Sequence, residues 1–124
     1  MHLPDHEPNA AFARMGIPLH FAVKPIREFL SANELLEKLH EIESDDIDAL
    51  VAFNLGALLD DASLEEAHHA CVFDRIVDGR VRLIDPSFYA PKWRIFDVEQ
   101  LFAAMQKHVS SDWGGVWVLT KIDA

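Results

Sequence analysis

The feature that most constrains this chain is an Asp78-Gly79 step between two runs of strand-forming residues. The runs are residues 68–77 and 80–85, and a short Asp-Gly step between two such runs is typical of a β-hairpin. Histidines open the first run, and an Asp85-Pro86 step closes the second. A histidine and a carboxylate on neighbouring strands are the residue types of a general base and the group that orients it. The hairpin therefore predicts both the sheet and a candidate site.

The length of the turn decides which histidine faces Asp85. A two-residue turn over Asp78-Gly79 places Asp85 on the strand face of His68. A three-residue loop places Asp85 opposite Cys71 and diagonal to His69, because side chains alternate between the two faces of a strand. Diagonal neighbours lie about 7–8 Å apart at the backbone, which a carboxylate and an imidazole can bridge. We favour the three-residue loop and His69, with His68 as the alternative.

Hydrophobic periodicity predicts the remaining elements. Residues 31–34 and 97–100 match the capping box, in which the two side chains each satisfy a backbone N–H at a helix start. The predicted elements are strands over 19–23, 49–53 and 116–122, and helices over 32–43 and 98–108. The element order is β-α-β-β-β-α-β, which predicts an α+β fold with a mostly antiparallel sheet and two main helices.

Four other stretches carry no clear strand or helix pattern. We expect a loose arm over residues 1–17, with at most one helical turn within it, followed by a single domain over 18–124. The acidic residues 41–48 predict a solvated turn. Residues 55–67 are expected to form a long connection, and residues 86–95 an irregular stretch rich in aromatic rings.

Composition excludes several kinds of partner. The net charge is -10, with 11 lysines and arginines against 21 acids, which argues against binding to nucleic acid or to an anionic membrane. No apolar run approaches the roughly 20 residues of a membrane span, and no secretory signal is visible at the N-terminus. The single cysteine excludes an intrachain disulfide and fits a reducing compartment, so we expect a cytoplasmic protein.

Five features in a fixed order resemble a known family. The first two are a histidine that opens a strand, His69, and a strand that ends in Leu-Ile-Asp-Pro, residues 83–86. An aromatic stretch follows over residues 88–93. The last two are a helix with Leu-Phe-Ala-Ala-Met, residues 101–105, and a final strand that opens with glycine, residues 115–119. From about Leu19 to Ile122 the chain resembles the C-terminal half of the papain-like cysteine-enzyme domain. Phytochelatin synthases are the most similar, and peptidase C39-like families come next.

The resemblance implies a base and its orienter without a nucleophile. In those families the histidine at the strand start is catalytic and the aspartate orients it, which implies these roles for His69 and Asp85. Their nucleophilic cysteine opens a helix in the N-terminal half, and this chain has no cysteine before Cys71. The likeness therefore covers most of this chain but about half of the family's domain.

Two functions follow from this reading. The first is a degenerate module that binds a peptide or a protein partner, with Asn54, Phe88, Tyr89 and Trp93 as binding residues. A half-domain exposes apolar surface, so we also expect a homodimer. The alternative is a cysteine-dependent acyl transferase or peptidase that uses Cys71 or a cysteine from another chain. Cys71 is the less favourable nucleophile, because a strand lacks the helix N-terminus that lowers a thiol pKa and a nearby carboxylate raises it.

A metal site is the third possibility. Among the seven histidines, His69 with Cys71 or Asp85 supplies suitable ligand types for a transition metal. The chain has no CxxC spacing, and its other histidines are scattered along the sequence. We therefore expect no metal and no cofactor.

Overall fold

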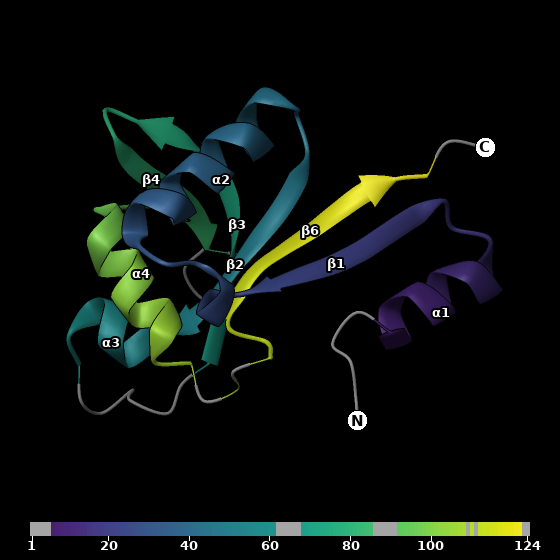
Figure 1. The fold of residues 1–124 in the computed structure, drawn as a ribbon, viewed down its shortest axis with the longest axis horizontal. Coiled ribbons are helices and arrows are strands. Elements are labelled where there is room, and N and C mark those ends of the chain that lie inside the picture. Colours follow the sequence, from purple (N-terminus) through teal and green to yellow (C-terminus); the bar gives the residue numbers. More distant parts are fainter. Residues whose placement is uncertain (1–5, 62–67, 86–91, 109, 111, 123–124) are drawn as a thin grey trace.

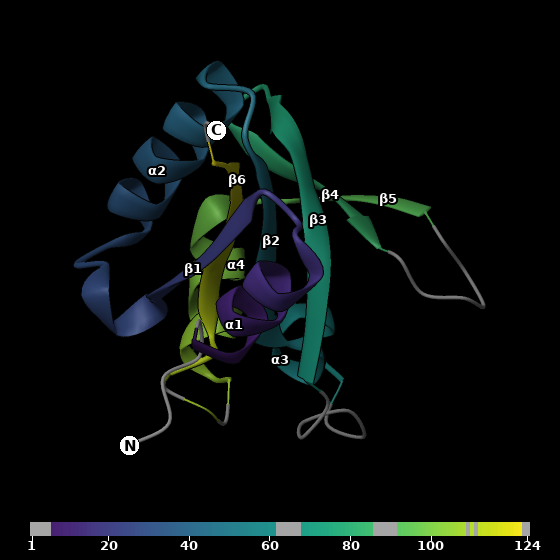
Figure 2. The same cartoon turned by 90° about the vertical axis from the view of Figure 1, so that its right-hand side faces the viewer.

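A six-stranded sheet forms the centre of the protein within the residues that this computed structural model describes, which are 6–61, 68–85, 92–108, 110 and 112–122. The strands lie in the order β1-β6-β2-β3-β4-β5, and each neighbouring pair is antiparallel. Figure 2 shows β1 and β6 at one side of the sheet and β4 and β5 at the other. Their bounds are β1 Leu19–Pro25, β2 Asp48–Asn54, β3 His68–Val77, β4 Arg80–Asp85, β5 Lys92–Phe96 and β6 Gly115–Lys121.

Helices α2, α3 and α4 lie together beside the sheet, whereas α1 lies apart from them next to β1 (Figure 1). The helical segments are α1 His6–Met15, the short 3-10 helix η1 Ile26–Glu28, α2 Ala32–Ser44, α3 Leu55–Leu59 and α4 Val98–Gln106. The predicted α+β class is confirmed. The predicted order β-α-β-β-β-α-β is also found, with α1, η1, α3 and β5 added to it.

Helix α2 begins where the capping box predicts. The side chain of Ser31 accepts a hydrogen bond from the backbone N–H of Glu34 at 3.3 Å, and the Glu34 carboxylate accepts one from a backbone N–H just before the cap at 3.2 Å. Leu35, Leu39 and Ile42 then recur at helical spacing and are fully buried. The periodicity of the sequence therefore identified both the start of this helix and its inward face.

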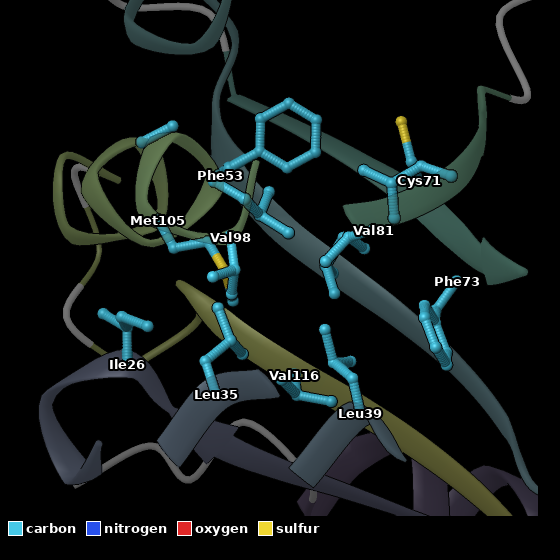
Figure 3. Packing of buried hydrophobic residues seen from close by; sticks show 14 of the residues in the cluster. Ile26, Leu35, Leu39, Phe53, Cys71, Phe73, Val81, Val98, Met105 and Val116 are labelled. Carbon is cyan, nitrogen blue, oxygen red and sulfur yellow. The ribbon is translucent and has the colours of Figure 1, made fainter. Parts of the chain in front are cut away.

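The core fills the space between the sheet and these helices (Figure 3). Apolar side chains from α2 and α4 meet the inward face of the central strands, which carries Val51, Phe53, Cys71 and Val116. These four side chains are completely buried. Burial of such side chains contributes about 1.5–3 kcal/mol each for the larger ones, so this face determines how the strands are oriented.

Helix α4 begins at the predicted position but lacks the predicted capping box. Asp97 occupies the cap position without a side-chain hydrogen bond to the helix. Its carboxylate instead forms an ion pair with Arg80 of β4 at 3.3 Å. The competing positive charge on a neighbouring strand was not apparent from the local sequence pattern.

Three stretches are more ordered than expected. The arm expected to be loose is helical from His6 to Met15, and the Asn9 side chain ties it to β1 by accepting from the Phe21 N–H at 2.7 Å and donating to the Phe21 carbonyl at 2.8 Å. The connection expected over 55–67 begins with α3, and its residues 62–67 lie outside the described residues. The stretch expected to be irregular ends in β5, which gains its order by pairing with β4.

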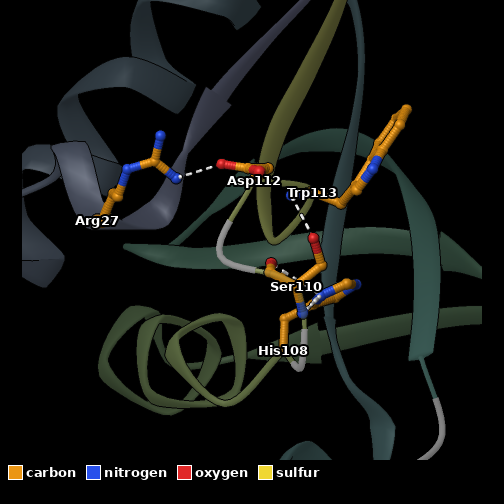
Figure 4. Close-up of polar contacts among 5 residues, drawn as sticks. All are labelled: Arg27, His108, Ser110, Asp112 and Trp113. Atoms are coloured by element: carbon orange, nitrogen blue, oxygen red, sulfur yellow. Dashed lines mark hydrogen bonds and ion pairs between the residues drawn. The ribbon is translucent and has the colours of Figure 1, made fainter. Parts of the chain in front are cut away.

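The segment between α4 and β6 is held by local polar contacts (Figure 4). His108 Nδ1 accepts from the Ser110 N–H at 3.1 Å, and the Ser110 hydroxyl accepts from the Trp113 N–H at 3.2 Å. Asp112 pairs with Arg27 of η1 at 3.0 Å. These contacts position the start of β6. No described helix is both long and apolar enough to cross a membrane.

Candidate functional site

The hairpin β3–β4 brings the predicted site together by an unexpected route. Val77 pairs with Arg80, so the turn has two residues, and Asp78 and Gly79 adopt φ angles of 51° and 76°. Such positive φ angles at both positions are typical of a type I′ hairpin turn. The predicted three-residue loop is therefore wrong. If the pairing continued regularly from this turn, Asp85 would lie on the same strand face as His68.

A β-bulge restores the register that favours His69. The pairing shifts by one residue between Phe73 and Arg75, and beyond the shift Val72 pairs with Ile84. Continuing this register places Asp85 opposite Cys71 and diagonal to His69. Two strand residues then oppose one across the bulge, which reverses the faces on which the following side chains lie.

The bulged residue, Asp74, is held by charged neighbours. Its carboxylate accepts a hydrogen bond from Arg82 Nε at 2.6 Å and lies 3.4 Å from Arg75 Nε. Close by, the Glu43 carboxylate of α2 accepts a hydrogen bond from the backbone N–H of Ile76. These contacts join β3 to β4 and to α2 on either side of the bulge, and so fix the position at which the register changes.

His69 and Asp85 are in direct contact. His69 Nε2 lies 2.8 Å from Asp85 Oδ1, and the side chains are 23% and 3% exposed. The predicted pairing of these two residues is thus confirmed. When Nε2 donates to the carboxylate, Nδ1 of the neutral ring is an acceptor. In the part of the chain that the structure describes, Nδ1 has no hydrogen-bond partner, so the ring has the arrangement of an oriented base.

Arg94 is a component of the site that the sequence analysis missed. Its Nε donates to Asp85 Oδ2 at 3.1 Å, so the buried carboxylate has a different partner on each oxygen. The positive charge balances the charge of Asp85, whose burial would otherwise be costly. Recognising residues 92–96 as a strand would have placed Arg94 on this face by alternation.

The ring of His69 also packs against Phe53 of β2. The two ring centroids lie 5.8 Å apart at an interplanar angle of 77°, an edge-to-face arrangement. Phe53 is fully buried, and its backbone pairs with that of His69 in the sheet. The imidazole is therefore restrained by both a hydrogen bond and an aromatic contact.

Cys71 has the properties of a core residue. Its side chain is completely buried in the hydrophobic cluster (Figure 3). Burial, followed by the nearby negative charge of Asp85, raises the pKa of the Cys71 thiol from 9.0 to about 12, although Arg94 acts in the opposite direction. A neutral, inaccessible thiol is a poor nucleophile. These properties disfavour the version of the enzyme hypothesis that uses Cys71.

The two predicted binding residues that the structure describes, Trp93 and Asn54, do not form part of the His69–Asp85 pair. Trp93 is 63% exposed and lies across from Ile84, on the opposite face of the sheet from Asp85. Asn54 is buried, and its amide caps α3 through the Ala57 N–H at 3.0 Å and reaches the Lys107 carbonyl at 3.3 Å. Phe88, Tyr89 and the side chain of His68 lie outside the described residues.

Three metal-ligand types meet at the pair. The ligand atoms of His69, Cys71 and Asp85 all lie within 4.8 Å of one another. The sequence analysis named His69 with Cys71 or Asp85 as suitable ligand types but expected no metal, and the structure brings all three residues together through two strands and a bulge. A comparison with known protein families and with curated proteins found no match to this chain. The function is therefore argued from the geometry of the chain itself.

Proposed function

We propose that this chain is a papain-like half-domain that binds a protein partner through the open face of its sheet. The observation that carries the proposal is a row of apolar side chains on the face opposite the helices. The row follows directly paired residues across all six strands: Val23, Trp117, Leu50, Val72, Ile84 and Trp93. We call these six residues the apolar row.

The apolar row is exposed most at its β5 end. Trp93 is 63% exposed, Val72 is 36% exposed, and Ile95, which lies next to the row on β5, is 47% exposed. Side chains on the other face of the same strands are buried beneath α2, α3 and α4. A contiguous apolar surface of this kind usually marks an interaction site, whereas single exposed apolar residues do not.

The charge of the chain favours a basic partner. Where β2 begins beside the end of β6, a hollow of about 350 Å³ is lined by Asp45, Asp46 and Asp48, with Lys121 and apolar side chains beside them. The whole chain carries a net charge of -10. A partner with an apolar patch bordered by lysine or arginine complements this surface, and opposite charges accelerate such an association. A second copy, the homodimer expected from the sequence, has the same net charge and is the less complementary occupant.

The proposal is tested by removing exposed side chains without disturbing the core. Trp93→Ser combined with Ile95→Ser removes two large exposed side chains of β5, and Leu30→Ser, at a residue that is 88% exposed in the loop before α2, is the matched control. The native and variant proteins are used as baits in quantitative cross-linking, and each candidate partner is then purified and its Kd is measured at two salt concentrations.

We expect one basic partner that binds the native chain and the Leu30→Ser control, binds the double variant at least about tenfold more weakly, and loses affinity as salt rises. Equal binding by all three proteins would contradict the proposed surface. Sedimentation of the same proteins tests whether a second copy of the chain covers the apolar row instead. A native dimer that becomes monomeric only in the double variant would show this.

A second function is supported by the His69–Asp85 contact. We propose that the pair acts as base and orienter for a cysteine from another chain, in a cysteine-dependent acyl transfer or peptide hydrolysis. That other chain is a second partner that approaches from the helix side of the sheet, because His69 and Asp85 lie on the face opposite the apolar row. The supporting observations are the 2.8 Å contact and the partly exposed ring, whose Nδ1 has no partner among the described residues. A reducing, cytoplasmic setting fits such a thiol and the free cysteine of this chain.

This second function is tested with a thiol-alkylating probe on the purified complex with that second partner. A partner cysteine next to His69 should be alkylated faster with the native chain than with His69→Ala or Asp85→Asn, because a neighbouring imidazole promotes thiolate formation. His40→Ala, at an exposed histidine of α2, is the control and should leave the rate unchanged. Partner thiols that react equally in all complexes would exclude acyl transfer and leave the binding function intact.

A further inference from the structure

We propose that His69, Cys71 and Asp85 form a binding site for a divalent transition-metal ion of the Zn²⁺ type. The ligand atoms of these residues, one imidazole nitrogen, one sulfur and one carboxylate oxygen, all lie within 4.8 Å of one another. The site is distinct from the proposed partner-binding face, because Trp93 and the rest of the apolar row lie on the other side of the sheet. It rests on the geometry of β3 and β4 and does not depend on a partner.

The backbone places the three ligands for convergence. His69 and Cys71 are two residues apart on β3 and share a face, and Asp85 reaches them from β4. A tetrahedral Zn²⁺ with bonds of about 2.0–2.3 Å needs ligand atoms about 3.3–3.8 Å apart. The 2.8 Å separation of His69 Nε2 and Asp85 Oδ1 must therefore widen by about half an ångström. The separations of up to 4.8 Å must shorten by about 1 Å, which small side-chain rotations can supply.

The chemistry of the ligands selects the kind of ion. A thiolate and an imidazole favour Zn²⁺ or Co²⁺ over Mg²⁺ and Ca²⁺, which prefer oxygen ligands. One thiolate and one carboxylate supply two negative charges to a divalent ion, and Arg94 beside Asp85 leaves the bound group with a net charge of +1. Binding exchanges the ion for the Cys71 thiol proton, which leaves to solvent, while the Nε2 proton of a neutral His69 moves to Nδ1. Three protein ligands leave the fourth position for a water molecule or a ligand.

Arg94 orients one of the ligands. It donates to Asp85 Oδ2 and leaves Oδ1 directed toward His69. A hydrogen bond to the far oxygen of a carboxylate ligand is a usual feature around protein-bound metals. The ion and the hydrogen-bonded pair use the same atoms of His69 and Asp85, so the two states exclude each other. A bound metal would accordingly block any use of His69 as a base.

The site is tested by titrating Co²⁺ into chelator-treated native protein. Because the chain has a single cysteine, a thiolate-to-cobalt charge-transfer band can come only from Cys71. We expect this band, tetrahedral d–d bands, a stoichiometry of one ion per chain, and displacement of the cobalt by Zn²⁺. The metal should also raise the thermal unfolding temperature of the native protein, since it binds the folded state alone.

Variants separate this site from adventitious binding. Cys71→Ser should abolish the charge-transfer band, and His69→Ala and Asp85→Asn should each weaken binding about tenfold or more by removing a ligand. The exposed histidines serve as controls, so His20→Ala and His40→Ala should bind as the native protein does. The proposal is overturned if folded native protein gives no thiolate band, or if the histidine controls weaken binding as much as His69→Ala. The native titration decides the matter even if a variant does not fold.

Discussion

Asp85 is the residue on which the candidate site most depends, because its two carboxylate oxygens serve different partners. Oδ1 meets His69 Nε2 at 2.8 Å, and Oδ2 accepts from Arg94 at 3.1 Å. The carboxylate is 3% exposed and therefore depends on these neighbours for compensation. The orientation of His69 is thus a property of three adjacent strands, β3, β4 and β5.

Cys71 gives a prediction for metal-free protein at the same scale. The pKa of its thiol is raised from 9.0 to about 12 by burial and by Asp85, so the unfolded chain releases this proton at lower pH than the folded chain does. The contribution is fully present below pH 9 and is lost as pH rises from 9 toward 12. Native protein should therefore lose more unfolding free energy than Cys71→Ala in this range, by up to about 1.4 kcal/mol per pH unit. Urea unfolding of both proteins at several pH values measures this difference, and parallel profiles would contradict it.

At the scale of elements, the bulge in β3 produces the predicted register between His69 and Asp85 by a different local structure from the one predicted. The sequence analysis reached the pairing of Asp85 with His69 through a three-residue loop, whereas the chain uses a two-residue turn and a bulge at Asp74. The alternation of apolar and polar residues along the strands indicated this register, because Cys71, Phe73 and Leu83 must share the buried face. The position of the bulge was not predictable, since Arg82, which contacts Asp74, and Glu43, which contacts the nearby Ile76, come from other elements.

Helices α2 and α4 provide a matched test of capping. Ser31 caps α2 through its side chain, whereas Asp97 at the start of α4 makes no such bond and pairs with Arg80 in an exposed position. Ser31→Ala should lower the unfolding free energy by about 1 kcal/mol. Asp97→Ala should lower it by less than about 0.5 kcal/mol, because exposed ion pairs contribute little. Chemical denaturation of both variants gives the values, and a larger loss for Asp97→Ala would show that Asp97 also stabilises the start of α4.

At the scale of the whole molecule, the two ends of the chain meet in β1 and β6. Pro25 pairs with Gly115 at the point where these strands meet η1, and the Ile26 N–H donates to the Gly114 carbonyl at 2.7 Å. Gly115 has a φ of +153°, and a Cβ there would lie 2.2 Å from the Lys24 carbonyl oxygen. Only glycine lets the two backbones approach this closely.

Gly115→Ala should therefore be strongly destabilising, by about 3 kcal/mol or more, because it combines backbone strain with a backbone clash. Gly79→Ala is the control, since Gly79 has a φ of +76° and no atom within 4 Å of an added Cβ. That change should cost about 1–2 kcal/mol from the left-handed conformation alone. Thermal and chemical unfolding measure both, and equal losses would mean that the contact between Gly115 and Lys24 relaxes readily.

The sequence by itself determined the α+β class, the capped helix α2 and the hairpin, and it narrowed the partner of Asp85 to His68 or His69, because these follow from local periodicity, turn residues and alternation. The tertiary structure alone decided the bulge at Asp74, the edge strand β5 with Arg94, and the apolar row across six strands. Each of these joins residues that are distant in the chain. Their free energy comes from pairing and packing between elements, which no local pattern contains.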